Sequence, residues 1–339
     1  MTQVFSDSDS GTWASPTVLS LRNAVRANLP ADTQSVFVGC SGGPDSLVLA
    51  AVACWVGARA GFQVHTVTVD HQLQADSAGI AHTAAAQATE LGAASAQVVT
   101  VNVTGTGGME AAARQARREA LIGAAKGAPI LLGHTANDQA ETVLLRLLRG
   151  AGTHSLSAMA AVDHPWYRPF LANTRAEIEV AVPELLTPLG ITPWVDPHNL
   201  SHDFARVRMR EHMQRLTEDF GPGLVASLVR TADLARSDDT ALEQLASDFL
   251  VVQELSVGSE QQVDIDSLTK LPQAVRSRVI RRMYSGCAAV ERESSPLTYN
   301  HVQAIEALIT DWHGQGVIAL PLGVCVSRER DRLSFYPST

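Results

Sequence analysis

Residues 35–46 read SVFVGCSGGPDS, so that Ser41-Gly42-Gly43-Pro44-Asp45-Ser46 follows an apolar, β-branched run directly. The run from Ser35 to Cys40 predicts a strand, and the Ala/Leu-rich segment at about 46–60 predicts a helix. A glycine-rich turn between them can direct backbone N–H groups, hydroxyls and a helix N-terminus at one anion. We therefore interpret residues 41–46 as a phosphate-binding loop; the alternative is an ordinary glycine-rich turn. A Walker A loop is excluded because no Gly-Lys-Ser/Thr is present.

The same alternation of elements continues beyond this loop. Further strands are predicted at 63–70, 96–103 and 129–133, and further helices at 76–91 and 109–126. This pattern is typical of an α/β fold, a doubly wound parallel sheet. Ligands bind beyond the carboxyl ends of such strands, so the residues after Cys40, Val69 and Leu132 are expected to line a site.

The rest of the chain predicts a second, smaller α+β domain. Helices are expected at about 137–149, at 174–186 behind a Thr174-x-x-Glu177 capping box, and at 203–218. Gly221-Pro222-Gly223 is the best boundary, and a connecting helix is expected at about 224–256. The remaining expected elements are helices at 272–285 and 298–311 and strands at 316–320, 323–328 and 332–336. We thus predict an N-terminal tail and first helix at 1–34, a catalytic domain at 35–220, and the connecting helix with the small domain at 221–339.

Composition narrows the class of protein. Of 339 residues, 45% are hydrophobic and 18% charged, which excludes a disordered chain. The four cysteines are far apart and form no Cys-x-x-Cys, so neither a disulfide framework nor a zinc ribbon is supported. The polar N-terminus is not a secretory signal, and no apolar run is long enough to span a membrane, so we expect a cytoplasmic protein. The net charge of −9 argues against non-specific nucleic-acid coating but permits a local basic groove.

Two later segments carry charged candidates for ligand binding. Asp138 and Glu141 are three residues apart on a predicted helix, so both carboxylates can face one side and bind a cationic amine. The alternative is that they oppose the dipole of that helix at its N-terminus. The Arg114 guanidinium could hold a substrate carboxylate, or could pair with Glu110 on a solvated helix face.

The loop at 41–46 resembles the PP-loop of the ATP pyrophosphatase family, Ser-Gly-Gly-x-Asp-Ser. That resemblance implies that ATP is bound and cleaved between its α- and β-phosphates, leaving AMP and pyrophosphate. Asp45 would then coordinate Mg²⁺, or it caps the following helix instead. Val69 could contact the adenine, whereas for His71 a ligand contact and a plain loop position are equally supported.

A longer set of motifs, over roughly residues 35–215, resembles the tRNA(Ile)-lysidine synthetase family. It comprises the loop, Val69-Asp-His71, Met109-Glu-Ala-Ala-Ala-Arg114, Gly133-His134 with Asp138-Gln-Ala-Glu141, Arg168-Pro-Phe-Leu with Arg175, and Asp196-x-x-Asn199. The resemblance implies a ligase that uses ATP to adenylate the C2 oxygen of the wobble cytidine in tRNA(Ile) with a CAU anticodon. The ε-amine of free L-lysine then displaces AMP, which gives lysidine.

The resemblance also implies roles for individual residues. ATP would be held by Ser41, Gly42, Gly43, Pro44, Asp45, Ser46 and Val69. Lysine would be held by Arg114, Asp138 and Glu141, and the candidates for the general base are Asp45 and His134. The tRNA would be contacted by Arg168, Arg175, Arg206, Arg210 and Arg281, although for such cations a solvated surface is the alternative. Gln72, Gln74 and Val207 depart from the family pattern and weaken individual polar contacts.

Two other functions compete with the ligase. Thiolation of tRNA through a similar adenylate usually needs catalytic cysteines or an iron–sulfur cluster, and here no cysteine pair is close in sequence. A non-catalytic nucleotide sensor would need the loop but neither the carboxylates at 138 and 141 nor a basic second domain, for which Arg276, Arg278, Arg281 and Arg282 are the candidates.

Overall fold

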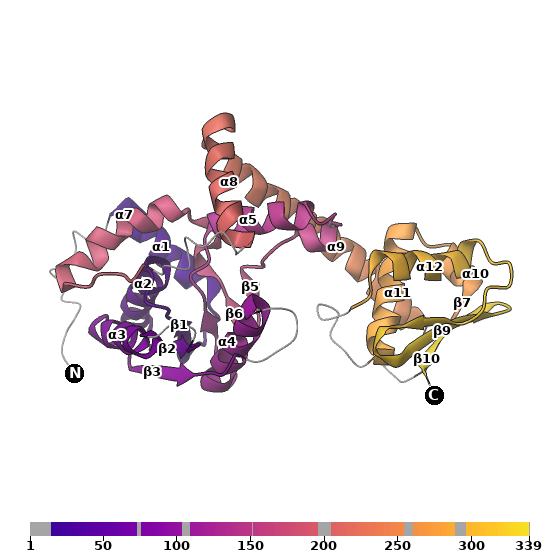
Figure 1. Ribbon diagram of the computed structural model, residues 1–339, viewed down its shortest axis with the longest axis horizontal. Helices are drawn as coiled ribbons and strands as arrows, with labels where there is room; N and C mark the ends of the chain where they lie inside the picture. Colours follow the sequence, from indigo (N-terminus) through magenta and orange to yellow (C-terminus); the bar gives the residue numbers. More distant parts are fainter. Residues whose placement is uncertain are drawn as a thin grey trace. The chain divides into compact units, whose positions relative to one another are not determined.

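The computed structural model describes residues 15–72, 76–103, 109–150, 152–195, 205–253, 260–288 and 296–338 (Figure 1). The chain divides into two compact units, one that ends at Leu234 and one that begins at Ala235. This division falls inside helix α9 (Leu224–Val252), within the segment that was expected to connect the domains. Each unit is described by itself below.

The first unit is built on a six-stranded sheet with the order β3-β2-β1-β4-β6-β5. All neighbouring strands are parallel except the pair β5 and β6, which is antiparallel. The strands are β1 (Ser35–Gly39), β2 (Gln63–Asp70), β3 (Ser95–Thr100), β4 (Ile130–Leu131), β5 (Val162–Asp163) and β6 (Trp166–Tyr167). The predicted α/β fold is confirmed, and β5 and β6 are additions that the sequence pattern did not predict.

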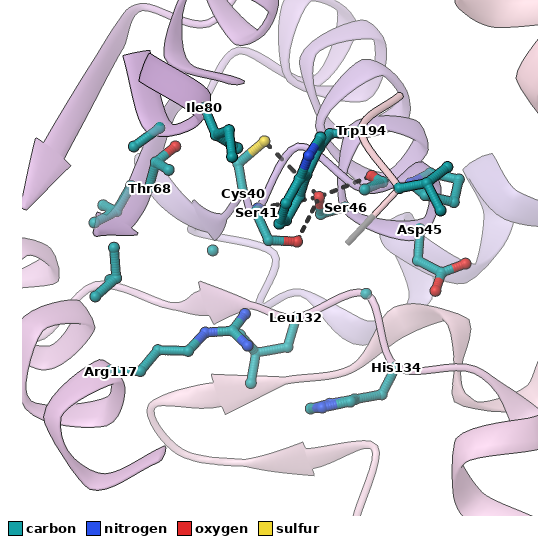
Figure 2. A pocket seen from close by; sticks show the side chains of 18 of the residues that line it. Cys40, Ser41, Asp45, Ser46, Thr68, Ile80, Arg117, Leu132, His134 and Trp194 are labelled. Carbon is teal, nitrogen blue, oxygen red and sulfur yellow. Dashed lines mark hydrogen bonds between the residues drawn. The ribbon is translucent and has the colours of Figure 1, made fainter. Parts of the chain in front are cut away.

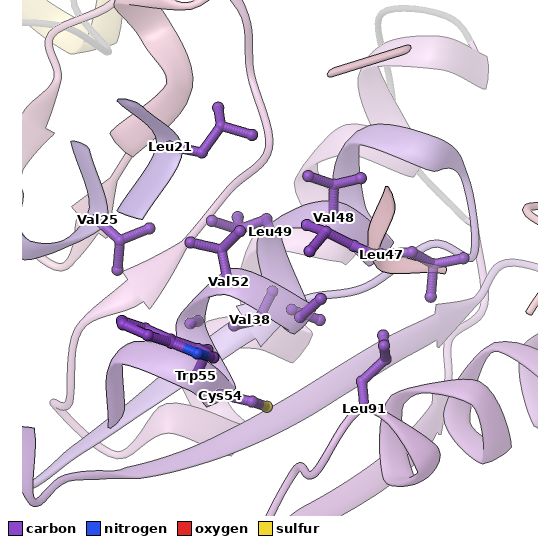
Figure 3. Close-up of a cluster of buried hydrophobic side chains, with 14 of the residues drawn as sticks. Leu21, Val25, Val38, Leu47, Val48, Leu49, Val52, Cys54, Trp55 and Leu91 are labelled. Atoms are coloured by element: carbon purple, nitrogen blue, oxygen red, sulfur yellow. The ribbon is translucent and has the colours of Figure 1, made fainter. Parts of the chain in front are cut away.

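Helices cover both faces of this sheet, as a doubly wound fold requires. They are α1 (Pro16–Asn28), α2 (Pro44–Ala60), α3 (Ser77–Glu90), α4 (Met109–Ala125), α5 (Ala136–Leu147), α6 (Thr153–Leu156), α7 (Arg175–Leu185) and α8 (Ala205–Phe220). The buried side chains of β1 belong to two separate hydrophobic clusters, one on each face of the sheet. Val36 and Val38 pack with α1, α2 and α7 (Figure 3), whereas Phe37 packs with Leu121 of α4. Because neighbouring residues of a strand point to opposite faces, β1 is buried on both sides.

The second unit packs helices on an antiparallel sheet with the order β7-β10-β9-β8. Its elements are β7 (Gln261–Asp264), α10 (Ile265–Thr269), α11 (Gln273–Ala288), α12 (Tyr299–Thr310), β8 (Ile318–Leu320), β9 (Val324–Glu329) and β10 (Arg332–Pro337). Tyr284 and Phe335 are among the largest side chains of its buried core. The predicted small α+β domain is confirmed. In the described part of the chain, no helix combines the length and apolar character needed to cross a membrane.

Candidate functional site

A cavity of about 560 Å³ opens at the carboxyl edge of the first unit's sheet (Figure 2). The ends of β1, β2 and β4 and the first turn of α2 surround it, at the place where ligands bind in open α/β sheets. The predicted site residues that line it are Ser41, Gly43, Pro44, Asp45, Ser46, Val69, His134, Asp138, Arg175 and Arg210. The fold therefore brings the loop and the second charged segment to one place.

The loop at 41–46 is shaped by hydrogen bonds of Ser46 and by one glycine. The Ser46 hydroxyl donates to the carbonyl of Gly43 at 3.0 Å and accepts from the amide of Ser41 at 3.1 Å. Gly42 has a φ of +82°, a conformation that side chains rarely adopt. Gly43 is the N-cap of α2 and gives it no side-chain cap, so the first amides of α2 remain available to an anion.

Gly133, just after β4, lets two walls of the cavity meet. A Cβ at this position would lie 2.9 Å from the carbonyl oxygen and 3.0 Å from the carbonyl carbon of Asp45. Only glycine permits that approach without backbone movement. The contact joins the loop after β1 to the segment that leads into α5.

Asp45 carries a buried carboxylate oxygen, Oδ1, with no hydrogen-bond partner among the described residues. Burial and, to a smaller extent, the nearby Asp138 carboxylate raise the pKa of this carboxyl to about 6. An unsatisfied carboxylate oxygen in a phosphate-sized cavity fits Mg²⁺, which is usually bound by one or two carboxylates together with substrate phosphates. Among the described residues there is no cluster of three or more acidic, histidine or cysteine side chains that could hold a metal alone.

His134 follows Gly133 and also faces the cavity. Burial lowers the pKa of its imidazole to about 3, against the opposing effect of Asp138. The ring is therefore neutral at physiological pH, and it is a weak base. Of the two predicted general bases, Asp45 is the better candidate, because its pKa lies closer to neutrality than that of His134.

Asp138 and Glu141 do face one side of α5, because Arg175 contacts both. Arg175 lies 3.2 Å from Asp138 Oδ1 and 3.4 Å from Glu141 Oε1, and Arg210 lies 3.4 Å from the same Glu141 oxygen. Glu141 is 2% exposed, and its second oxygen, Oε2, is buried without a partner in the described structure. This carboxylate therefore retains one acceptor for a further cation.

Asp138 lies in the first turn of α5, where the alternative interpretation has its charge oppose the helix dipole, and it also caps that turn. Its Oδ2 accepts from the amide of Thr135 at 2.8 Å and from the Thr135 hydroxyl at 2.9 Å, which completes a capping box. The Arg175 guanidinium holds the pKa of the Asp138 carboxyl below its usual range, although burial opposes that effect. Asp138 thus combines helix capping with a place in the cavity wall.

Arg114 and Arg206 lie beside the cavity without lining it. Arg206 donates to the Thr142 hydroxyl at 3.5 Å, and its charge lowers the pKa of the Arg114 guanidinium, after the larger effect of burial. Burial raises the pKa of the Glu141 carboxyl, and Arg206 is one of the nearby charges that oppose this effect. Arg114 and Glu141, two of the three residues expected to hold lysine, therefore both lie near Arg206. Val207 is buried, so that position faces the interior.

Several arginines expected to contact tRNA are engaged within the protein. Arg168 is 6% exposed and donates to the carbonyl of Ala160, and Arg281 donates to that of Leu297. Arg276 and Arg278 of α11 were candidates for an exposed basic surface, and that prediction is wrong. Each is 8% exposed and paired with a buried acidic side chain. Arg175, likewise, is engaged within the protein, because it lies in the cavity wall and is paired with Asp138.

Arg117 and Trp194 are among the residues of the cavity wall that were not predicted from the sequence as site residues. Arg117 is three residues beyond Arg114 in the same basic segment, and that spacing could have revealed it. Trp194 had no comparable signal; its amide donates to the carbonyl of Gly42 at 2.8 Å, and its indole forms part of the wall (Figure 2). His71 also lines the cavity. In the turn after β2, the backbone amide of Gln72 donates to Asp70 Oδ1. Gln74, Asp196 and Asn199 lie outside the described residues.

Comparisons with known proteins agree with this geometry. Residues 17–216 match the model of the PP-loop domain, and residues 264–334 match that of the TilS substrate binding domain. The chain is 41% identical over 326 residues to tRNA(Ile)-lysidine synthase from Rhodococcus erythropolis, covering 94% of this chain and 95% of that protein. It is 43% identical over 315 residues to the enzyme of that name from Thermobifida fusca, covering 90% and 93%.

A solved structure shares the fold at low sequence identity. The U34-tRNA thiolase NcsA from Methanococcus maripaludis matches with a TM-score of 0.54 at 19% identity, over 65% of this chain and 80% of that one. The likeness concerns the architecture alone. The family models and the full-length relatives together establish that this chain belongs to the tRNA(Ile)-lysidine synthase family, with a PP-loop domain at its core.

Proposed function

We propose that this chain is an ATP-dependent ligase that adenylates the wobble cytidine of tRNA(Ile) with a CAU anticodon and attaches L-lysine to form lysidine, releasing AMP and pyrophosphate. The observation that carries the proposal is a single cavity that is lined by the loop at 41–46 and by Asp138 of α5, with Glu141 reached through their shared partner Arg175. A nucleotide sensor would need the loop alone. We place the enzyme in the cytoplasm, where its three substrates occur together.

ATP occupies the cavity with its terminal phosphates on the loop and the first turn of α2. Ser41, Ser46 and the α2 amides supply donors, and Val69 and Trp194 provide apolar wall for the adenine. Asp45 would hold Mg²⁺ through Oδ1, which has no partner among the described residues. Bound there, the ion neutralises charge on the phosphates.

The first step forms a bond between the cytidine O2 and the α-phosphorus, and it breaks the bond from that phosphorus to the bridging oxygen. The electron pair of that bond leaves with pyrophosphate. In the second step the neutral lysine ε-amine bonds to C2, the C2–O bond breaks, and its electron pair leaves with AMP. The amine must lose a proton, and of the two candidate acceptors Asp45 is the stronger base, because burial lowers the pKa of His134 to about 3.

Lysine binds between α5 and the neighbouring arginines. Its ε-amine contacts the second oxygen of Glu141, and its carboxylate contacts Arg114. One arginine can pair with the carboxylate of lysine, and two acidic side chains can pair with its two amines. The tRNA is held by the second unit, for which the match to a TilS substrate binding domain is the support, and by Arg206 beside the cavity and Arg210 in its wall.

A transfer assay tests the proposal. Labelled lysine, Mg·ATP and a tRNA with a CAU anticodon should yield labelled RNA and AMP, and the same tRNA with uridine at the wobble position should yield neither. Cadaverine, which lacks the carboxylate, should react poorly, and Nε-acetyl-lysine, which lacks the nucleophile, should not react. Release of ADP, or labelling that ignores the wobble base, would exclude this reaction.

A further inference from the structure

Arg117 of α4 reaches the floor of the cavity. It lines the cavity together with Cys40 and His134, and Figure 2 shows its guanidinium beside Leu132. A Cβ on Gly39 would lie 3.5 Å from Arg117 Nη2, so the guanidinium lies against the last residue of β1. That is the point at which the strand passes into the phosphate-binding loop.

Arg117 differs from the other arginines of the cavity wall in its partners. Arg175 and Arg210 are paired with the carboxylates of α5. Within the described structure, Arg117 has neither an ion pair nor a hydrogen bond, although its side chain is partly buried. A partly buried cation without a counter-charge is costly, and a bound anion would remove that cost.

The groups that face Arg117 do not supply the missing charge. Burial lowers the pKa of His71 and of His134, so both rings are neutral. Burial raises the pKa of the Cys40 thiol, which keeps it neutral, and Arg206 adds a second positive charge. The local field is therefore positive on this side of the cavity, whereas Asp45 and Asp138 make the opposite side acidic. A negative group of the substrate would be drawn to the Arg117 side.

We propose that Arg117 is a catalytic residue that binds the α-phosphoryl group of ATP, and this rests on the ligase function proposed above. With the terminal phosphates on the loop and the adenine against Val69 and Trp194, the α-phosphoryl group lies between them, over the end of β1. The guanidinium occupies that place and offers a planar pair of donors for two phosphoryl oxygens.

Arg117 acts on both chemical steps in the same way. Negative charge spreads over the oxygens of the α-phosphorus as the cytidine O2 bonds to it and pyrophosphate leaves. In the second step AMP departs with the electron pair of the C2–O bond, and the same guanidinium faces the phosphoryl group that receives it. Arg117 stays protonated throughout, so it stabilises charge and moves no proton.

The phosphoryl group that Arg117 binds has one other conceivable source, the tRNA backbone. Arg114 and Arg206 are close enough to influence its charge, and they could extend a path for RNA phosphates toward the cavity. The two sources differ in which kinetic constant responds to a substitution. Loss of an α-phosphoryl contact lowers kcat, whereas loss of a backbone contact raises KM for tRNA and reduces its salt dependence.

The experiment compares Arg117→Met and Arg117→Lys with Arg118→Met in the full-length enzyme. Arg118 is the matched control because it lies on the same helix but stacks its guanidinium on Trp166, 4.5 Å from the ring centroid. Exchange of labelled pyrophosphate into ATP, with tRNA but without lysine, isolates the first step. Release of AMP after lysine is added to the preformed adenylate isolates the second.

We expect Arg117→Met to lower kcat of both steps by about 100-fold or more, with little change in KM for tRNA. Arg117→Lys should recover part of that loss, and Arg118→Met should stay within about 3-fold of the unchanged enzyme. Normal exchange by Arg117→Met would overturn the inference, as would a defect confined to KM for tRNA. If Arg117→Met does not fold, Arg117→Lys carries the test through the same constants. Failure of the unchanged enzyme to transfer lysine would instead refute the ligase function.

Discussion

Gly133 lies so close to Asp45 that a single added carbon at residue 133 would come within 2.9 Å of the Asp45 carbonyl oxygen. The atoms on both sides of this contact are backbone atoms. Neither can turn away as a side chain does, so the spacing between the loop after β1 and the start of α5 depends on this glycine.

Gly133→Ala should therefore weaken both stability and ATP binding. Relief of the overlap requires the backbone to shift, which costs about 1–3 kcal/mol and displaces the first turn of α2. Thermal unfolding and ATP titration measure the two effects. Gly123→Ala is the matched control, because a Cβ at that position of α4 meets nothing within 4 Å. Equal behaviour of the two variants would show that the close approach is unimportant.

The acid–base state of Asp45 predicts a pH profile. Because its pKa is raised to about 6, the carboxylate proposed to bind Mg²⁺ is lost below that pH. The kcat/KM for ATP should rise by about 10-fold per pH unit up to pH 6 and then level off. Asp45→Asn should give low activity without this rise, whereas Asp32→Asn, at an exposed position, should retain it. A rise that persists in Asp45→Asn would assign the titration to another group.

The same shift predicts that Asp45 lowers stability at neutral pH. The folded state holds the proton up to about pH 6 and the unfolded state only up to about 3.8, so stability falls as pH rises between these values. Asp45→Asn should therefore raise the free energy of unfolding at pH 8 by on the order of 2 kcal/mol, and by less at pH 5. Urea unfolding at both pH values measures this difference. A variant less stable than the unchanged chain at pH 8 would contradict the predicted sign.

Glu141→Gln should separate the two chemical steps. It removes the charge that Arg175 and Arg210 share and the oxygen proposed for the lysine amine. Lysine transfer should fall by about 100-fold, whereas tRNA-dependent pyrophosphate exchange should fall by less than about 5-fold. Asp138→Asn is the companion variant, because asparagine can still cap α5 while the charge is lost. Parallel loss of both steps in Glu141→Gln would assign this residue to ATP binding or folding.

Trp194 should report nucleotide binding directly. Its indole lines the cavity, so ATP should change the tryptophan fluorescence, and Trp194→Phe should abolish that change. Trp194→Ala should also weaken ATP binding by about 10-fold, because an aromatic wall is lost. Trp312→Phe, in the second unit, is the control and should retain the ATP signal. A signal that survives in Trp194→Phe would place the nucleotide base elsewhere.

The order of elements in the first unit could be predicted because its strands and helices carry long apolar runs. Residues 36–40 read VFVGC without a charged or strongly polar side chain, residues 63–70 are rich in Val and Thr, and glycine marks the end of the helix at residue 61. The strands β5 and β6 have two residues each, too few to show any periodicity, and β7 reads Gln-Gln-Val-Asp, which resembles a loop. These segments become strands because the tertiary fold places them beside other strands with which they pair.

The charges of the site could be identified from the sequence, but their pairing could not. The spacing of Asp138 and Glu141 correctly placed them on one face of α5. That Arg175 would join them, 37 and 34 residues away, depends on how α7 packs. Arg276 and Arg278 were misread for the same reason, because Glu306 and Asp239 are distant in the chain. Local patterns reveal which residues are charged, and only tertiary structure shows which charges are already neutralised.

The bond from residue 194 to the carbonyl of Gly42 is made by the main chain, whereas the cavity wall at residue 194 is made by the indole. Nineteen of the amino acids can make that bond, and proline alone lacks the necessary hydrogen. A substitution at residue 194 can therefore change the shape of the cavity wall while the hydrogen bond that holds the loop is kept. The side chain that contacts the substrate and the geometry of the loop can thus evolve independently at this position.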